Sequence, residues 1–400
     1  MKTMKTHSKL RFLSLIIVML LVLIPVIACS NGSSENNSGK SSNSTESADK
    51  SLAGSAPANS PAEPKKAEGW DAVVEAAKKE GKLVLSTHPG QLEQKWVAEF
   101  QKAYPEIKVE HTGISPSTFA TRVVTEQQNK QFLWDVMVAS TSAMTDIMAP
   151  AGAFENLKPI LSDLPNAKDN LWNGGLDYYA QNVSETKYTF IFALKKSDLL
   201  YINHDAKNAD QFKGIKDLNN PVFKGKIVTA DPGIGATSIP VYVSMLNQEG
   251  EAFIQKLFTD QDVTVVKDIV QGTNWLADGR YTISIGVDRA RMDELQKAGL
   301  CKKCEPFYYE GVPAFTRGVS EMKNAPHPNA AKVFINWLMG KEGQTFITKA
   351  IDLDSRRTDV APATSAPIDW KQLDKYVIVG TEKTLPLEAK FKSVYMSVNK

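Results

Sequence analysis

The sequence has little net charge and few of the short motifs that mark enzymes. Its 400 residues hold 47 Lys and Arg against 45 Asp and Glu, for a formal net charge of +2. Such a balance excludes the strong basic field that nucleic-acid binding requires. The sequence also lacks Gly-x-Ser-x-Gly, His-Glu-x-x-His and the phosphate-binding Gly-x-x-x-x-Gly-Lys-Ser/Thr. Ser320-Glu-Met-Lys323 spells Ser-x-x-Lys, but the partner motifs of serine acyl-enzymes are absent. We therefore expect neither an enzyme nor a cofactor.

A long apolar run occurs at the N-terminus. Basic residues precede an apolar stretch at residues 12–28, an order typical of a secretory signal. The stretch ends in Ala28-Cys29 and resembles a bacterial lipobox, so we predict that residues 1–28 are a signal peptide and that Cys29 is lipidated. Losing this segment's 4 basic residues would change the formal net charge from +2 to −2. A transmembrane helix is the alternative, but the run is short and contains Pro25.

Cysteine is scarce, with only 3 in the chain. Beyond Cys29, Cys301 and Cys304 form a Cys-x-x-Cys pair, and in an exported chain we expect a local disulfide. A zinc site would need a second pair of ligands, and a redox motif would need the pair at a helix start. Lys302 and Lys303 between the cysteines instead indicate a surface turn, so we predict no metal here.

The remaining chain divides by composition into a tether and two lobes. Residues 29–68 are rich in Ser, Asn, Gly, Ala and Pro, too polar to fold, and would span roughly 35 Å as a random coil. About 330 residues follow, more than one core usually supports. We predict a first lobe at residues 69–200, a second at 201–305, and a return to the first at 306–400.

Alternating strands and helices follow the tether. A helix from Trp70 stops at Gly81, strands are predicted near residues 82–86, 107–109 and 134–139, and helices lie between them. This order predicts a doubly wound parallel sheet, the α/β class, with ligands at the carboxyl ends of its strands. The polar residues at those ends are Ser86, Thr87, His88, Ser140 and Thr141.

The pattern restarts in the second lobe. Strand 226–230 leads into a Gly-containing turn with Asp231, Gly235 and Thr237, and strand 281–285 ends before Asp288 and Arg289. Backbone N–H groups at a helix start favour anions, and an arginine binds carboxylate, phosphonate or sulfonate in bidentate fashion. The alternative is that Asp231 caps a helix and Arg289 is a surface charge.

Several segments in order carry a family likeness. They are Asp71–Leu85, Arg122–Gln128, Trp134–Val136, Phe223–Ile227, Asp231–Pro232, Ala330–Leu338 and Arg356–Asp359. Together they resemble the family 1 extracellular solute-binding proteins of ABC importers, in the ferric-iron-binding-like branch. The resemblance implies a type II periplasmic-binding fold, with two α/β lobes joined by two crossover segments that close on a ligand. It also implies permease subunits as partners and places Arg356 and Arg357 near the cleft.

The chain departs from the iron-binding pattern at one position. Iron-binding members carry adjacent tyrosines after the strand that here ends at Gly286, where this chain has Val287–Ala290. Tyr308-Tyr309 lies further on, and alternate residues of a strand face opposite ways, so only one ring can enter a cleft. A metal site with His88 and one of these tyrosines remains an alternative; whether His111 meets His88 is open.

These observations lead to one expected function. We predict a lipid-anchored binding protein on the outer face of the cytoplasmic membrane, monomeric, that captures a small anionic or polar organic solute for an ABC permease. No nucleic-acid partner is expected. A ferric-iron carrier is the alternative within the class, and an exported enzyme or sensor on the same scaffold is the alternative outside it.

Overall fold

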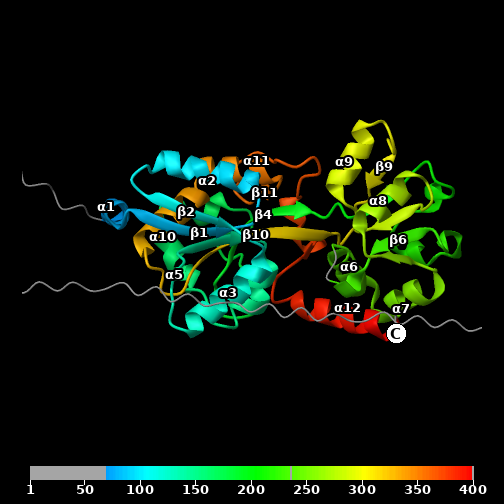
Figure 1. The fold of residues 1–400 in the computed structure, drawn as a ribbon, viewed down its shortest axis with the longest axis horizontal. Helices are drawn as coiled ribbons and strands as arrows, with labels where there is room; N and C mark the ends of the chain where they lie inside the picture. Colours follow the sequence, from blue (N-terminus) through cyan, green and yellow to red (C-terminus); the bar gives the residue numbers. More distant parts are fainter. Residues whose placement is uncertain (1–68, 235–236, 399–400) are drawn as a thin grey trace, which may run out of the picture. The chain divides into compact units, whose positions relative to one another are not determined.

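The computed structural model describes residues 69–234 and 237–398 (Figure 1). The predicted signal peptide at 1–28, the lipidated Cys29, the tether to residue 68 and Gly235 lie outside these residues. Within the described ranges, no helix is both long enough and apolar enough to cross a lipid bilayer.

The first sheet has seven strands in the order β11-β4-β10-β3-β1-β2, with β12 paired to β10. The parallel part is β1, β2 and β3, while β10 runs antiparallel to β3 and β4. The strands are β1 (Lys82–Thr87), β2 (Lys108–Gly113), β3 (Val136–Ala139), β4 (Phe190–Lys196), β10 (Pro313–Glu321), β11 (Asp354–Ser355) and β12 (Val377–Ile378).

Helices cover both faces of this sheet. One core cluster joins the sheet to α1, α2 and α10, and another joins its opposite side to α3 and the turns after β3. Gly81 ends α1 in the left-handed conformation (φ 65°), and Ser115 caps α3 ahead of Pro116, as helix-terminus chemistry favours. The helices are α1 (Trp70–Glu80), α2 (Gln91–Ala103), α3 (Pro116–Gln128), α4 (Thr141–Ala143), α5 (Leu157–Ser162), α10 (Pro328–Met339) and α11 (Lys341–Ile351), with a π-helical turn at Met144–Met148.

The second sheet has five strands in the order β7-β6-β8-β5-β9. Strand β6 is parallel to β7 and β8, and β5 is antiparallel to β8 and β9. The strands are β5 (Leu200–Asn203), β6 (Ile227–Ala230), β7 (Thr264–Val266), β8 (Ile283–Ile285) and β9 (Cys304–Pro306), and the helices are α6 (Ile239–Glu249), α7 (Glu251–Asp260), α8 (Ile269–Ala277) and α9 (Arg289–Lys297). The predicted fold class, with two α/β sheets, is confirmed.

Two crossover segments connect the sheets. Residues 197–199 lead from β4 to β5, and residues 307–312 lead from β9 back to β10. Each segment is short, and the strands on its two sides belong to different sheets. Residues at these crossovers can therefore contact both halves of the protein.

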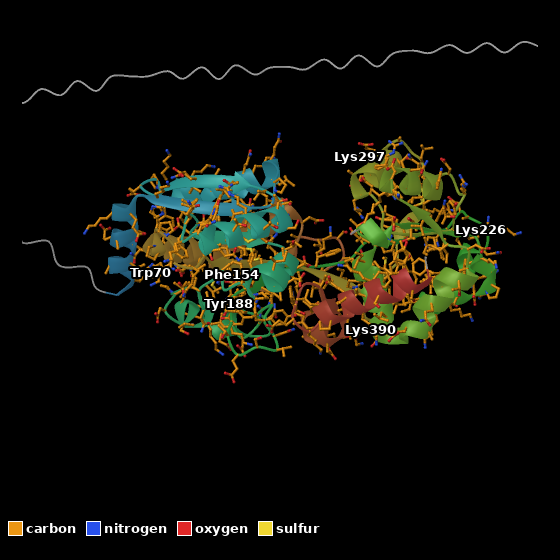
Figure 2. All side chains as sticks on the ribbon, turned by 60° about the horizontal axis from the view of Figure 1, so that its bottom comes forward. Trp70, Phe154, Tyr188, Lys226, Lys297 and Lys390 are labelled. Carbon is orange, nitrogen blue, oxygen red and sulfur yellow. A yellow bond between two sulfur atoms is a disulfide. The ribbon has the colours of Figure 1, made fainter. Side chains whose placement is uncertain are left out.

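The last helix differs from its predicted place. The prediction assigned residues 306–400 to the first lobe, but α12 (Leu385–Val398) packs against α6 and α7 beside the second sheet. Its Phe391 ring stacks on Tyr242 with centroids 5.0 Å apart. Lys390, which Figure 2 labels on this helix, pairs with Glu251 of α7 at 2.8 Å. The apolar side of α12 completes the second core, so after β12 the chain passes from the first sheet to the second lobe once more.

Candidate functional site

The carboxyl edge of the first sheet brings together the polar residues that follow β1 and β3. The main-chain nitrogen of Ser140 lies 3.0 Å from Nε2 of His88. Burial, followed by the charge of Arg317, lowers the pKa of His88 to about 4, so this ring is neutral at pH 7. His88 and Ser140 are the predicted residues at this edge that are partly exposed, so both are placed to meet a solute.

Three other polar residues at this edge are buried within the protein. Thr141 is fully buried, and its hydroxyl contacts Thr316 Oγ1 at 2.6 Å and the Gly380 carbonyl at 2.7 Å. Thr87 is buried and contacts Nε2 of His111 at 2.7 Å. Ser86 is buried as well, so these three side chains do not present the surface that was predicted for them. The contacts also show that His111 meets Thr87 and not His88.

At the second sheet, Asp231 and Asp288 organise the loops that follow β6 and β8. Oδ1 of Asp231 accepts from the Gly233 N–H at 2.8 Å and from the Tyr395 hydroxyl at 3.1 Å. Asp288 caps α9 by accepting from the Arg291 N–H at 2.8 Å. For Asp231 a capping role was the alternative to ligand contact, whereas the cap formed by Asp288 was not predicted. Thr237, on the same loop as Asp231, is exposed.

Arg289 is the first residue of α9 and reaches the crossover between the sheets. Its Nη1 lies 3.2 Å from Oδ2 of Asp198 and also donates to the Tyr201 hydroxyl. Asp198 is itself 3.5 Å from Nζ of Lys195, which pairs with Asp352 at 2.7 Å. The Arg289 side chain remains 43% exposed, whereas that of Asp198 is 9% exposed. The crossover thus holds a chain of alternating charges that leads to a solvent-accessible guanidinium, whose Nη2 also lies 3.5 Å from Oδ1 of Asp293.

Cavities surround Tyr308, which lies in the return crossover. One of about 540 Å³, here called the hinge cavity, lies between β5, β9 and α9, and its lining includes Tyr201, Arg289, Lys302, Glu305 and Tyr308. A second, of about 320 Å³, lies on the other side of Tyr308 beside Lys196 and Tyr376. A narrow gap lined by Lys195, Lys196, Asp198, Arg289 and Tyr308 adjoins both. The lining of the hinge cavity therefore comes from β5, β9 with the turn before it, α9 and the return crossover, together with Ser365.

Tyr308 and Tyr309 point to different surroundings. Both lie in the return crossover and not in a strand, so the strand that the prediction assumed there is absent. Tyr309 packs against the second core, stacks on Phe307 and donates to Ser244 Oγ at 3.2 Å. Tyr308 is 37% exposed, and Nζ of Lys196 lies 5.9 Å from its ring centroid. Burial raises the pKa of Tyr308, so its phenol stays protonated at neutral pH.

Arg356 and Arg357 do not contribute to a ligand site. Arg356 is fully buried, and its guanidinium donates to the carbonyl oxygens of Asn173, Gly175 and Ile191. Arg357 is 4% exposed and donates to the Met339 carbonyl and the Asp359 carboxylate. These contacts replace the predicted ligand role with a structural one: the two guanidinium groups tie down loops of the first lobe.

The Cys301–Cys304 disulfide is present. It closes the turn between α9 and β9. In the part of the chain that the structure describes, no three His, Cys, Asp or Glu side chains gather closely enough to hold a metal ion.

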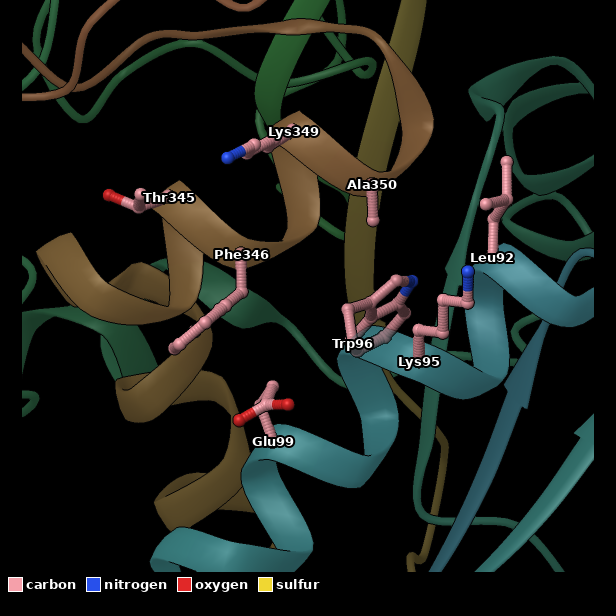
Figure 3. A pocket seen from close by; sticks show the side chains of 8 residues that line it. All are labelled: Leu92, Lys95, Trp96, Glu99, Thr345, Phe346, Lys349 and Ala350. Carbon is pink, nitrogen blue, oxygen red and sulfur yellow. The ribbon is translucent and has the colours of Figure 1, made fainter.

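A further groove lies between α2 and α11, and none of the predicted ligand residues lines it (Figure 3). Its volume is about 460 Å³, and Phe346 and Ala350 of α11 face Trp96 and Glu99 of α2. The exposed surface of its lining is mainly apolar, with Lys95, Glu99 and Lys349 among the lining residues. The hinge cavity fits a polar ligand better.

Sequence reasoning missed Lys195 at the end of β4, Asp198 in the crossover and Tyr201 in β5. The available signal was a charged Lys195-Lys-Ser-Asp198 segment between two apolar strands. Such a segment indicates a connection, but only the fold shows that it meets Arg289.

Comparisons with known proteins agree with this architecture. A family model for bacterial extracellular solute-binding proteins matches residues 95–375. An uncharacterized protein from Haemophilus influenzae is 30% identical over 144 residues, which cover 34% of this chain and 40% of that protein. This chain therefore aligns with less than half of that relative's length.

Solved structures with a similar fold share little sequence identity. Trichodesmium IdiA (FutA), in complex with iron and citrate, is 16% identical with a TM-score of 0.61, covering 80% of this chain and 99% of that one. Iron-bound HitA from Pseudomonas aeruginosa is 15% identical with a TM-score of 0.57, at 80% and 99% coverage. An ABC transporter protein from Clostridium perfringens is 17% identical with a TM-score of 0.61, at 80% and 100% coverage. At these identities the likeness establishes a shared fold.

Proposed function

Because this chain belongs to the bacterial extracellular solute-binding protein family, we propose that it is the solute-capturing subunit of an ABC importer. Family membership supports a binding role outside the cytoplasm. The lipobox-like segment ending at Cys29 supports a lipid anchor on the outer face of the cytoplasmic membrane. The permease of the importer is the partner that this role requires.

Arg289 carries the proposal for the chemistry of the solute. Its partly exposed guanidinium follows β8, lines the hinge cavity and stands beside the phenol groups of Tyr201 and Tyr308. A planar guanidinium suits bidentate contact with a carboxylate, phosphonate or sulfonate. The solute is therefore a small organic molecule with an anionic or strongly polar group.

Capture works by closure of the two α/β halves about the crossovers. Short segments that join separate sheets are the usual place for hinge rotation. A solute shifts the population toward the closed form only as far as it contacts that form better than the open one. The charge chain from Arg289 through Asp198 to Lys195 spans the crossover and would rearrange during closure.

Ferric iron is the second candidate, because the similar solved structures include iron-bound proteins. In this chain Val287–Ala290 occupy the place of the paired tyrosines, and Tyr309 is engaged in the second core. Only Tyr308 remains accessible, and one phenol is a weak basis for a ferric site. An organic solute is the better supported choice.

Native mass spectrometry of the freshly purified protein tests the proposal. The expected result is a retained organic molecule with an acidic group, unchanged in mass after prolonged incubation. A coloured complex formed on adding ferric citrate would favour the iron carrier. Conversion of the retained molecule into a product would favour an exported enzyme.

A further inference from the structure

The ring of His88 is held in one orientation by a main-chain contact. Its Nε2 lies 3.0 Å from the main-chain nitrogen of Ser140. A backbone N–H can only donate, so Nε2 accepts this hydrogen bond and carries no proton. In the neutral ring the proton must then lie on Nδ1.

Nδ1 of His88 is available to a ligand. It forms no hydrogen bond within residues 69–234 and 237–398, and it is not among the enclosed polar atoms that lack a partner. The low pKa of the ring keeps this nitrogen neutral and protonated at physiological pH. The edge of the first sheet therefore offers one fixed N–H donor.

Arg317 sets the electrostatic potential beside this donor. Strand β10 pairs Gly318 with Ala139, which places Arg317 next to the Ser140 position at the carboxyl edge. Its side chain is 11% exposed, and its Nη2 lies 3.1 Å from Oε1 of Glu93, whereas Nη1 is enclosed without a partner. The positive charge disfavours a proton on His88, and by the same sign it favours an anion there.

We infer that His88 recognises the solute by donating from Nδ1–H to an oxyanion oxygen, and that it is not a metal ligand. Arg317 is a positioning residue, because it acts through the charge state of His88. A metal would need an imidazole lone pair, but one nitrogen of His88 carries the proton and the other accepts from Ser140. This inference rests on the proposed solute-binding function and extends it to the first lobe.

Nitrogen NMR of the full-length protein with ¹⁵N-labelled histidine tests the tautomer directly. The His88 signals are assigned by their loss in His88→Gln among the 5 histidines of the chain. We expect the Nδ1–H tautomer at pH 7 and no protonation above about pH 5. An Nε2–H tautomer, or an imidazolium at pH 7, would overturn the inference.

Small anions and a metal serve as probes of the same signal. Citrate or inorganic phosphate at millimolar concentration is expected to shift the Nδ1–H resonance, whereas Zn²⁺ leaves it in place. Loss or broadening of the His88 signals with Zn²⁺, or no response to either anion, contradicts the inference.

A matched pair of variants separates the two ring nitrogens. His88→Asn keeps a donor near the Nδ1 position, and His88→Gln keeps a polar group near the Nε2 position. We expect His88→Gln to weaken binding of the responding anion roughly tenfold to a hundredfold, as loss of a charge-assisted hydrogen bond does. His88→Asn should retain most of the affinity; equal losses in both variants would contradict the Nδ1 assignment.

A double variant tests the role of Arg317. Arg317→Met combined with Glu93→Gln removes both buried charges, so neither is left unpaired. The pKa of His88 is expected to rise toward its ordinary value, while an unchanged pKa would refute the positioning role. If the retained solute binds and compacts the protein but His88 carries its proton on Nε2, only this inference fails. If no solute is bound and no compaction occurs, the proposed function itself is contradicted.

Discussion

Replacement of Arg289 by alanine has two separable consequences. The change removes the contact with Asp198 at 3.2 Å and the hydrogen bond to Tyr201, leaving a carboxylate with a 9% exposed side chain near Lys195 alone. A hydrogen bond to a charged group is worth about 1.5–3 kcal/mol, and the exposure of Arg289 reduces this to about 1–2 kcal/mol of folding stability. Solute affinity should fall at least tenfold, because the proposed bidentate contact is lost.

Arg291 provides a matched control two residues further along α9. It pairs with Glu294 at 3.1 Å, and its Nε donates to Oδ1 of Asn274 in α8 at 2.7 Å. Arg291→Ala should cost about 0.5 kcal/mol and leave solute binding unchanged. Urea denaturation measures stability, and calorimetric titration with the solute found by mass spectrometry measures affinity. Equal affinity losses in the two variants would refute the assignment of Arg289.

Three further predictions follow from individual side chains. Tyr309→Phe should lower the free energy of unfolding by about 1 kcal/mol, because the Ser244 contact is lost, and should leave solute affinity unchanged. Tyr308→Ala should instead weaken solute binding with little loss of stability. The reverse pattern in calorimetry and urea denaturation would count against the hinge cavity as the solute site. Arg356→Met should destabilise the first lobe by about 3 kcal/mol or more, since it leaves several buried carbonyl groups without donors. An unchanged melting temperature in thermal denaturation would argue against the structural role of Arg356. Burial raises the pKa of Glu321 to about 7, so the folded protein binds this proton more tightly than the unfolded chain does. The resulting stabilisation is complete below about pH 4 and is lost as the pH rises through 7. Glu321→Gln should flatten this dependence of the free energy of unfolding on pH, measured by denaturation at several pH values.

Local sequence patterns were sufficient to predict β1, β2 and β3 of the first sheet, but they did not predict β4, β11 or β12. Trp70–Glu80 ends at Gly81 because the chain adopts a left-handed conformation there, and Lys82–Thr87 is the strand that its apolar run predicts. Short-range signals of this kind depend only on neighbouring residues. The carboxyl-edge position of His88 and Ser140 follows equally from strand order.

Long-range packing explains what the sequence could not predict. The charges of Arg356 and Arg357 gave no sign that carbonyl groups nearly two hundred residues earlier would surround the first of them. Burial of Thr141 depends on the Gly380 carbonyl from a distant segment, and the position of α12 depends on an apolar surface formed by α6 and α7. Each of these outcomes is set by which partner the fold supplies, and side-chain chemistry alone does not contain that information.

Small-angle X-ray scattering with and without the retained solute tests the central claim most directly. Closure of two α/β halves around a bound molecule predicts that the radius of gyration falls on saturation and that Arg289→Ala requires more solute for the same change. A radius that stays constant while calorimetry shows the site to be full would contradict capture by closure.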